Sequence, residues 1–219
     1  MNHTLYVQLL DLACGAFLLA GVLVLWRRDL AAIVRLFALQ GAALAFLVAV
    51  LGVHEGEAEV IGLAVGLGLL RAVALPWLLR RAMVAGGGGR ETDPRVNVAA
   101  SLVIAALLAL LAYAVTRPVV ALDPTPAVQA VPVALTVVLI GFFVLVTRRR
   151  ALSQVVGFLL IDNGITAVAF LTTSGVPLIV ELGVSLDVLL AVLVLQVLTA
   201  RMRAAFGDTD LDDLRELRD

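Results

Sequence analysis

Seven runs of about twenty mostly apolar residues follow one another along this chain, separated by short polar breaks. A helix rises about 1.5 Å per residue, so about twenty residues cross the roughly 30 Å hydrocarbon core of a bilayer. The chain is 62% hydrophobic over 219 residues, with a mean hydropathy of +1.08. A soluble domain of this size cannot bury that much apolar surface. The sequence therefore predicts an all-α integral membrane protein.

Charged residues, glycine and proline mark the breaks between the runs, as in HEGEAE, RRAMVAGGGGRETDPR and TRPVVALDPTPAVQA. These breaks divide the chain into one seven-helix membrane domain, residues 1–200, and a short polar tail, residues 201–219. The predicted transmembrane helices cover residues 4–26, 31–53, 59–79, 96–116, 128–147, 153–173 and 177–200.

Arginine is distributed unevenly among the breaks. Of sixteen arginines, fourteen fall in alternate breaks and the tail, on one side of the predicted membrane. The other side has only Arg117, together with the acidic residues Glu55, Glu57 and Glu59. Because positive residues are retained on the cytoplasmic side, we expect the N-terminus outside and the C-terminus in the cytoplasm.

The residues that most often hold metals and redox centres are scarce. Cys14 is the only cysteine, and the two histidines, His3 and His54, are far apart in the sequence. A multi-cysteine iron–sulfur or zinc site within the chain is therefore excluded. The net charge of −1 lacks the basic footprint of a nucleic-acid-binding protein. We expect no cofactor, no metal and no nucleic-acid partner.

Five ionisable side chains lie inside the predicted spans, where a charge near the bilayer centre costs roughly 2.5–3.5 kcal/mol. They are Asp11, Arg71, Asp162, Glu181 and Asp187. Counted from the outer turns at about 1.5 Å per residue, Arg71, Asp162 and Asp187 are ~18–20 Å deep. Asp11 and Glu181 are ~9–10 Å deep. The sequence thus predicts two layers of charge within the apolar slab.

Two interpretations of these charges are open. In the structural one, Arg71 neutralises a mid-membrane aspartate and locks helices together. In the functional one, unpaired carboxylates bind protons readily because burial disfavours the charged form, and water links groups at successive depths into an ion path. The candidate translocation residues are Arg71, Asp162, Glu181 and Asp187, with Asp11, Asn163, Thr166 and Ser185 as secondary polar residues.

A proline lies close to the intramembrane arginine. Pro76 follows Arg71 by five residues inside the third predicted span, and proline removes one backbone hydrogen bond from a helix interior. Either the helix has an ordinary kink at this point, or the freed backbone carbonyls face water. The sequence leaves both outcomes open.

The most distinctive sequence is QVVGFLLIDNGI at 154–165 followed by GVPLIVELGVSLDVLLAVLV at 175–194. It resembles component E of hydrogenase-4-type complexes, the membrane-bound energy-converting nickel–iron hydrogenases and formate hydrogenlyases. LLRAVALPWLLRR at 69–81 and the tail fit the same family. That family is in turn similar to the K-type subunit of NADH–quinone oxidoreductase and to the C-type subunit of multi-component sodium/proton antiporters.

The resemblance implies roles for two residues. In the K-type subunit, glutamates on two adjacent membrane helices serve proton movement, and by motif Asp162 and Glu181 occupy the corresponding places. This chain departs from component E, which usually has glutamate where Asp162 stands. One methylene less shortens the reach of that carboxylate by ~1.3 Å, a gap that a water molecule can bridge.

The resemblance further implies a non-catalytic subunit in a bacterial or archaeal cell (inner) membrane. Nickel–iron and iron–sulfur centres would then belong to soluble hydrogenase partner subunits. The chain would pack beside antiporter-like and quinone-oxidoreductase-like membrane subunits and contribute carboxylates to proton or sodium translocation. Two alternatives stay open, a purely structural membrane anchor and a subunit of a multi-component cation/proton antiporter.

The polar tail has a helical spacing of its own. Leu211, Leu214 and Leu217 are three residues apart, with acidic residues before them and arginines later. Acids early and cations late suit the dipole of a short helix. Either this is a solvated helix end, or the leucines contact a cytoplasmic partner.

Overall fold

A computed structural model of the protein describes residues 1–85 and 96–173. Within these two ranges the regular structure is entirely helical, which confirms the predicted helical class. The elements are α1 (His3–Trp26), α2 (Leu30–Glu55), α3 (Ala58–Leu67), the π-helix η1 (Gly68–Ala74), α4 (Leu75–Ala85), α5 (Val98–Leu122), α6 (Pro126–Gln129), α7 (Val131–Thr147) and α8 (Ala151–Thr172).

Several of these elements join into longer rods. α3, η1 and α4 form one continuous span, Ala58–Val84, and α6 leads directly into α7 to form the span Pro126–Thr147. The described residues thus contain six helices long and apolar enough to cross a membrane. The seventh predicted helix, 177–200, and the tail, 201–219, lie outside the described residues.

The fourth helix differs from its prediction. The sequence predicts an end at residue 116, before the proline-containing break, yet α5 continues through Pro118 to Leu122. Proline is tolerated inside membrane helices because neighbouring groups satisfy the freed carbonyl. Thr116, two residues before Pro118, also donates its hydroxyl to the carbonyl of Ala112 at 2.7 Å within the same helix.

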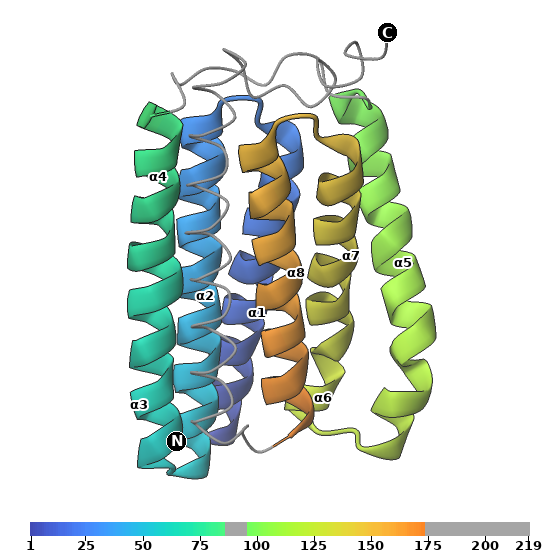
Figure 1. The fold of residues 1–219 in the computed structure, drawn as a ribbon. Coiled ribbons are helices and arrows are strands. Elements are labelled where there is room, and N and C mark those ends of the chain that lie inside the picture. The colour runs from blue at the N-terminus through green and yellow to red at the C-terminus, as the bar shows by residue number, and fades with distance from the viewer. Residues whose placement is uncertain (86–95, 174–219) are drawn as a thin grey trace, which may run out of the picture.

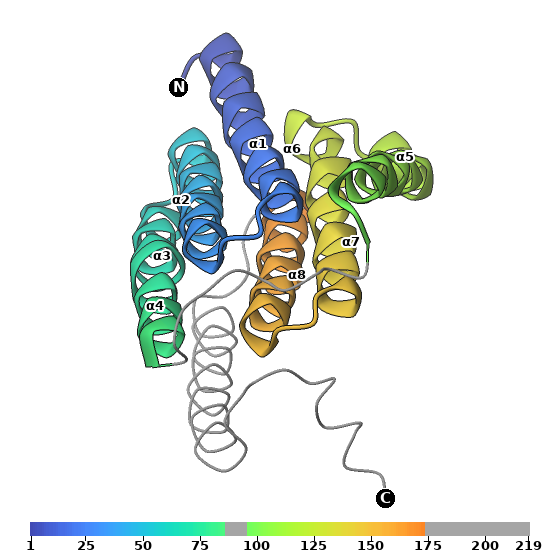
Figure 2. The same ribbon diagram turned by 90° about the horizontal axis from the view of Figure 1, so that it is seen from above.

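The spans stand side by side along one axis (Figure 1). Seen from above, α3 and α4 lie beside α2 on one flank, α1 and α8 are central, and α7 and then α5 lie on the other flank (Figure 2). α5 is the outermost and least covered span, with only 17% of its apolar window buried inside the bundle, compared with 61% for α8. The bundle therefore has a densely packed centre and one loosely packed edge.

Short polar side chains begin four of the six described spans. Asn2, Asp29, Asn97 and Thr125 each occupy the N-cap and accept a hydrogen bond from a backbone N–H of the first turn. Such caps satisfy donors that have no partner within the helix. At the other end of α2, Gly56 adopts φ +77°, a left-handed conformation that favours glycine at a helix C-terminus.

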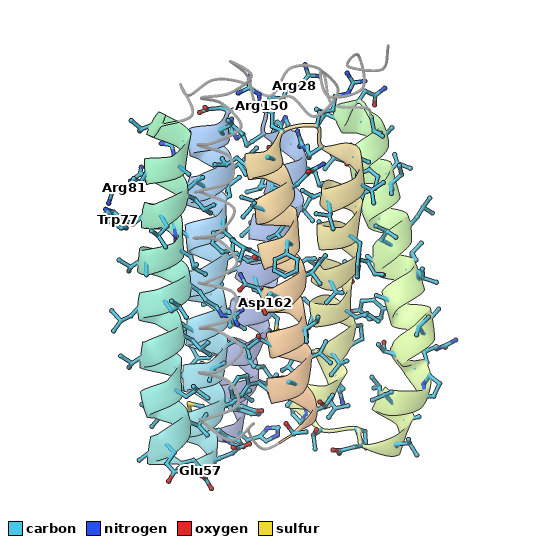
Figure 3. The ribbon with its side chains drawn as sticks, viewed as in Figure 1. Arg28, Glu57, Trp77, Arg81, Arg150 and Asp162 are labelled. Atoms are coloured by element: carbon cyan, nitrogen blue, oxygen red, sulfur yellow. The ribbon has the colours of Figure 1, made fainter. Side chains whose placement is uncertain are left out.

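The two ends of the bundle carry opposite charge. Arg28 and Arg150 lie at one end and Glu57 lies at the other (Figure 3). We call these the arginine end and the acidic end. At the arginine end, the guanidinium of Arg81 lies 5.7 Å from the ring centroid of the exposed Trp77. Tryptophan beside a cation is typical of the membrane–water interface.

One arginine at this end is buried and has a structural role. Nη2 of Arg148 donates to the carbonyls of Val24, Leu25 and Arg27 at 3.2, 3.0 and 3.3 Å. These carbonyls belong to the last turn of α1 and the residue after it, where backbone acceptors lack partners within the helix. Arg148, which precedes α8, therefore ties the end of α1 to the α7–α8 connection.

Glycines allow α7 and α8 to pack closely. A Cβ added to Gly157 would lie 2.8 Å from the backbone nitrogen of Leu145 and 3.0 Å from Cγ1 of Val144. Gly141 and Gly164 meet similar contacts across the same interface. Small residues are the usual means of bringing membrane helices together, because dispersion contacts replace the hydrophobic effect in lipid.

We expect Gly157→Ala to lower the free energy of unfolding by about 1–3 kcal/mol, because the added methyl group must displace backbone. The measurement is denaturation of the purified chain in mixed detergent micelles. Gly62→Ala is the matched control, since its Cβ would meet no described atom within 4 Å. Equal stability of both variants would contradict the close approach of α7 and α8.

Candidate functional site

A buried polar cluster lies in the middle of the bundle, where Figure 3 shows Asp162 about halfway between the two ends. Its central residue is Arg71 on η1, whose side chain is 1% exposed. Asp162, Asn163 and Thr166 come from α8, and Gln40 comes from α2. We call these five residues the Arg71 cluster.

Arg71 joins η1 to α8 through three contacts. Its Nη1 lies 2.7 Å from Oδ2 of Asp162, which is an ion pair. The same nitrogen donates to Oδ1 of Asn163 at 2.6 Å, and Nη2 donates to Oγ1 of Thr166 at 3.0 Å. A charged donor makes these bonds stronger than neutral ones. The guanidinium is thus held by one carboxylate and two neutral oxygens.

The spacing of α8 explains why three of its residues meet one guanidinium. Asp162 and Thr166 are four residues apart, so they are on the same face of the helix. Asn163 is turned by about 100° from Asp162 and extends the polar surface toward α2. Asp162, Asn163 and Thr166 therefore form one polar surface on α8, and its two neutral members accept hydrogen bonds from Arg71.

The backbone at Arg71 is a π-helix, and Pro76 follows it closely. The N–H of Leu75 donates to the carbonyl of Leu70, five residues back instead of four. Proline has no N–H, and its ring collides with the carbonyl four residues earlier in a regular α-helix. The wider turn relieves that collision. The sequence left open either an ordinary kink or carbonyls that face water, and the structure has a π-turn instead. π-turns inside α-helices are frequent at functional sites.

Gly41 brings α2 against the backbone of Arg71 itself. A Cβ at position 41 would lie 2.6 Å from the carbonyl oxygen of Arg71 and 2.7 Å from its carbonyl carbon. Only glycine fits such a close approach without a shift of backbone. The contact fixes the distance between α2 and η1, and it puts the neighbouring Gln40 next to the cluster.

Gln40 completes the cluster and is not among the residues that the sequence predicts for the site. Because Oδ1 of Asn163 accepts from Arg71, its Nδ2 must donate, and it does so to Oε1 of Gln40 at 3.0 Å. Gln40 is 0% exposed, and its own Nε2 has no partner among the described residues. One signal was available in the sequence, a single glutamine within a long apolar run, immediately before glycine.

Among the described residues, one predicted site residue, Asp11, is not joined to this cluster. Asp11 lies on α1, is exposed, and shares no hydrogen bond or ion pair with the described residues of the cluster. Glu181, Ser185 and Asp187 lie outside the described residues, as do Leu211, Leu214 and Leu217. Of the predicted charges, the described structure therefore brings together only Arg71 and Asp162.

The described residues hold no group of three histidine, cysteine, aspartate or glutamate side chains that could bind a metal. His54 instead stacks on the ring of Tyr6, with centroids 3.7 Å apart and planes 9° apart. Cys14 is buried as a free thiol on α1. In the described residues, Tyr6, His54 and Cys14 thus take part in packing, while Arg71 and Asp162 form the ion pair of the Arg71 cluster.

The chemistry of the cluster follows from its charges. Arginine stays protonated in proteins, so Arg71 needs an acceptor wherever it lies in an apolar slab. Asp162 supplies the opposite charge, and its side chain is still 13% exposed. Asn163 and Thr166 accept hydrogen bonds from the guanidinium in addition to that carboxylate, so Arg71 is linked to α8 by neutral as well as charged contacts.

We expect Arg71→Met to cost about 3–5 kcal/mol of unfolding free energy, because it leaves the Asp162 charge without its partner. The double variant Arg71→Met with Asp162→Leu should lose less than the sum of the two single variants. Denaturation in micelles measures all three. Arg35→Met on the exposed face of α2 is the control, and strictly additive losses would show that the pair does not couple.

We expect Gln40→Leu to cost about 1–3 kcal/mol, because the buried Nδ2 of Asn163 loses its acceptor. Gln8→Leu, an exposed glutamine of α1, should change the same free energy by less than about 0.5 kcal/mol. A Gln40→Leu variant as stable as the parent would mean that the Asn163–Gln40 hydrogen bond contributes nothing.

The fold and the cluster together define a class, multi-pass helical membrane proteins with an arginine–aspartate pair in the bundle interior. Within it, the chain belongs to the same family as the uncharacterized protein Rv0085 of Mycobacterium tuberculosis, to which it is 54% identical over 220 residues and the full length of both chains.

A second relationship is shorter. The chain is 33% identical over 115 residues to hydrogenase-4 component E of Escherichia coli strain K12, and equally to that of Shigella flexneri. The match covers 52% of this chain, which spans about half (53%) of the length of that relative. No protein-family model and no solved structure matches the chain. The likeness to the K-type subunit and to the antiporters stays a prediction.

Proposed function

We propose that this chain is a non-redox membrane subunit of an energy-converting nickel–iron hydrogenase or formate-hydrogenlyase-type complex. The partial identity with hydrogenase-4 component E supports this proposal, as do the six apolar spans. The nickel–iron and iron–sulfur centres would lie in soluble partner subunits. Antiporter-like and quinone-oxidoreductase-like subunits would be its neighbours in the membrane, and its arginine end would face the cytoplasm.

Within that complex, the chain contributes carboxylates to proton or sodium translocation. The observation that carries this proposal is the Arg71–Asp162 pair, 2.7 Å apart in the middle of the bundle. When Asp162 takes up a cation, the attraction between the pair is lost, while Asn163 and Thr166 continue to accept hydrogen bonds from Arg71. In the proposed exchange a second carboxylate then approaches Arg71. Glu181 and Asp187 on the predicted seventh helix are the residues we assign to that exchange.

The π-helix offers a physical route for coupling this exchange to movement. A π-turn is a single wide turn within an α-helix and is frequent at functional sites. Arg71 lies in the middle of η1. A change in the charge balance at Asp162 would therefore act, through Arg71, on the π-helical segment, and interior charges in membrane proteins often mark ion routes.

One observation favours a structural anchor as the second candidate. Arg71 is 1% exposed and contacts three side chains of α8, which is the geometry of a clamp between helices. In that case the pair stabilises the fold and moves no ion. The antiporter alternative predicts neighbouring genes for antiporter subunits, whereas our proposal predicts neighbouring genes for nickel–iron hydrogenase subunits.

Asp162→Asn separates the two candidates. The asparagine keeps the shape of the side chain and a hydrogen-bond acceptor for Arg71, but it cannot carry a proton. We expect the complex to assemble while ion uptake per turnover falls by at least about tenfold, equivalent to 1.4 kcal/mol. The assay is dye-reported ion uptake by inverted membrane vesicles during hydrogenase turnover, with complex recovery measured on the same vesicles.

Two further variants sharpen the result. Asp162→Glu restores the residue usual in component E and should retain uptake. Asp29→Asn, at the N-cap of α2, removes a carboxylate from the exposed surface and should leave uptake unchanged. Unchanged uptake in Asp162→Asn would end the translocation role, and a loss confined to assembly would favour the anchor.

A further inference from the structure

A cavity of about 340 Å³ lies between α1, α5, α6 and α7. Its polar lining comes from Asp11 and Cys14 on α1, Tyr113 on α5 and Gln129 on α6. It exists because α5 stands at the loosely packed edge of the bundle (Figure 2). The Arg71 cluster is elsewhere, where α2, η1 and α8 meet, so this cavity is a second and separate polar feature.

The cavity lies toward the acidic end. α6 is at the same end of the bundle as the N-terminus (Figure 1), and Glu57 marks that end in Figure 3. Asp11 is eight residues beyond the first residue of α1, so it is ~12 Å from the end of that helix. Asp11, Gln129 and Tyr113 all remain exposed. The cavity is therefore open to the outside of the bundle, and its lining runs from α6 at the acidic end to residues within the span of α1.

The lining has a definite chemical preference. Among the described residues, Asp11 has neither an ion pair nor a hydrogen bond. Gln129 donates its Nε2 to the carbonyl of Pro124 at 2.9 Å, so its Oε1 is left as an acceptor. The Tyr113 hydroxyl adds a third oxygen, and no arginine of the described residues lines the cavity. The lining thus offers three oxygen atoms, one of them on a carboxylate, and this chemistry favours cations over anions.

An ionised carboxylate is unstable in contact with hydrocarbon, because a charge inside the membrane costs several kcal/mol unless it is paired or hydrated. At about 30 Å³ per molecule, the cavity volume corresponds to about ten waters. We propose that this cavity is a water-filled vestibule in which Asp11 binds a small hydrated cation at the acidic end of the bundle. The vestibule raises the local cation concentration through the field of one carboxylate with low-dielectric walls.

The inference goes beyond the proposed function and does not depend on it. It requires no hydrogenase partner, no turnover and no role for Asp162. A chain that served only as an anchor would still have this vestibule. The two proposals therefore fail separately, provided that the vestibule is tested by a measurement that needs no catalysis.

The chain contains a single cysteine, which makes such a measurement direct. A Cβ at Gly15 would meet nothing within 4 Å, and Gly15 lines the cavity. Gly15→Cys combined with Cys14→Ser therefore puts one thiol in the vestibule without a clash. The probes are two methanethiosulfonates of similar size, one with a trimethylammonium group and one with a sulfonate.

Labelling is measured on the full chain in its native membranes, opened by freeze–thaw so that both faces are reached. Each rate is divided by the rate of the same reagent with a small free thiol, which removes intrinsic reactivity. We expect the cationic reagent to react roughly tenfold faster after this correction, because Asp11 lies one helical turn away. In an added Asp11→Asn background the ratio should fall to about one, and Asp11→Glu should restore it.

Leu12→Cys with Cys14→Ser is the control, because Leu12 is exposed on α1 but does not line the cavity. The thiol at position 12 should react slowly with both charged reagents. Equal corrected rates at position 15 with Asp11 intact would overturn the cation site. Reaction only with the lipid-soluble N-ethylmaleimide would show a lipid-filled cavity and overturn the vestibule. Recovery of each variant from the membrane fraction shows that it is inserted.

Discussion

The charge on Arg71 is the constraint on which the interior of this bundle depends. Because a guanidinium keeps its proton, it is stable in an apolar interior only when a carboxylate balances its charge and oxygen atoms accept its hydrogen bonds. Asp162, Asn163 and Thr166 supply them from one helix, and Gln40 completes the hydrogen bonding from another. The π-turn before Pro76 and the close contact at Gly41 are the backbone features that bring these side chains together.

The bundle has a densely packed centre and a loosely packed edge. The Arg71 cluster lies in the centre, and the cavity lined by Asp11 lies at the edge. Glycine contacts hold α7 to α8 and α2 to η1, and the Gly41 contact brings the backbone of α2 against Arg71 itself. α5 is mostly uncovered and borders the cavity at Asp11. A charge in the tight region must be paired by protein, whereas a charge beside the loose edge can be reached by water.

Membership in the family of Rv0085 extends over the whole chain, while the likeness to hydrogenase-4 component E covers about half of it. The shorter match agrees with the apolar spans of the described residues. Within those residues, an ion pair and a π-turn meet in one residue, Arg71.

Hydropathy alone determined the helical membrane class and the first six spans, because apolar runs of that length have few other stable folds. It also identified Arg71, Asp162, Asn163 and Thr166, since polar residues inside such runs are conspicuous. Only the tertiary structure decided which of them meet, because pairing depends on helix rotation and neighbour order, which composition does not encode. For the same reason it alone revealed Gln40 as a partner, the continuation of α5 through Pro118, and the cavity that Asp11 lines.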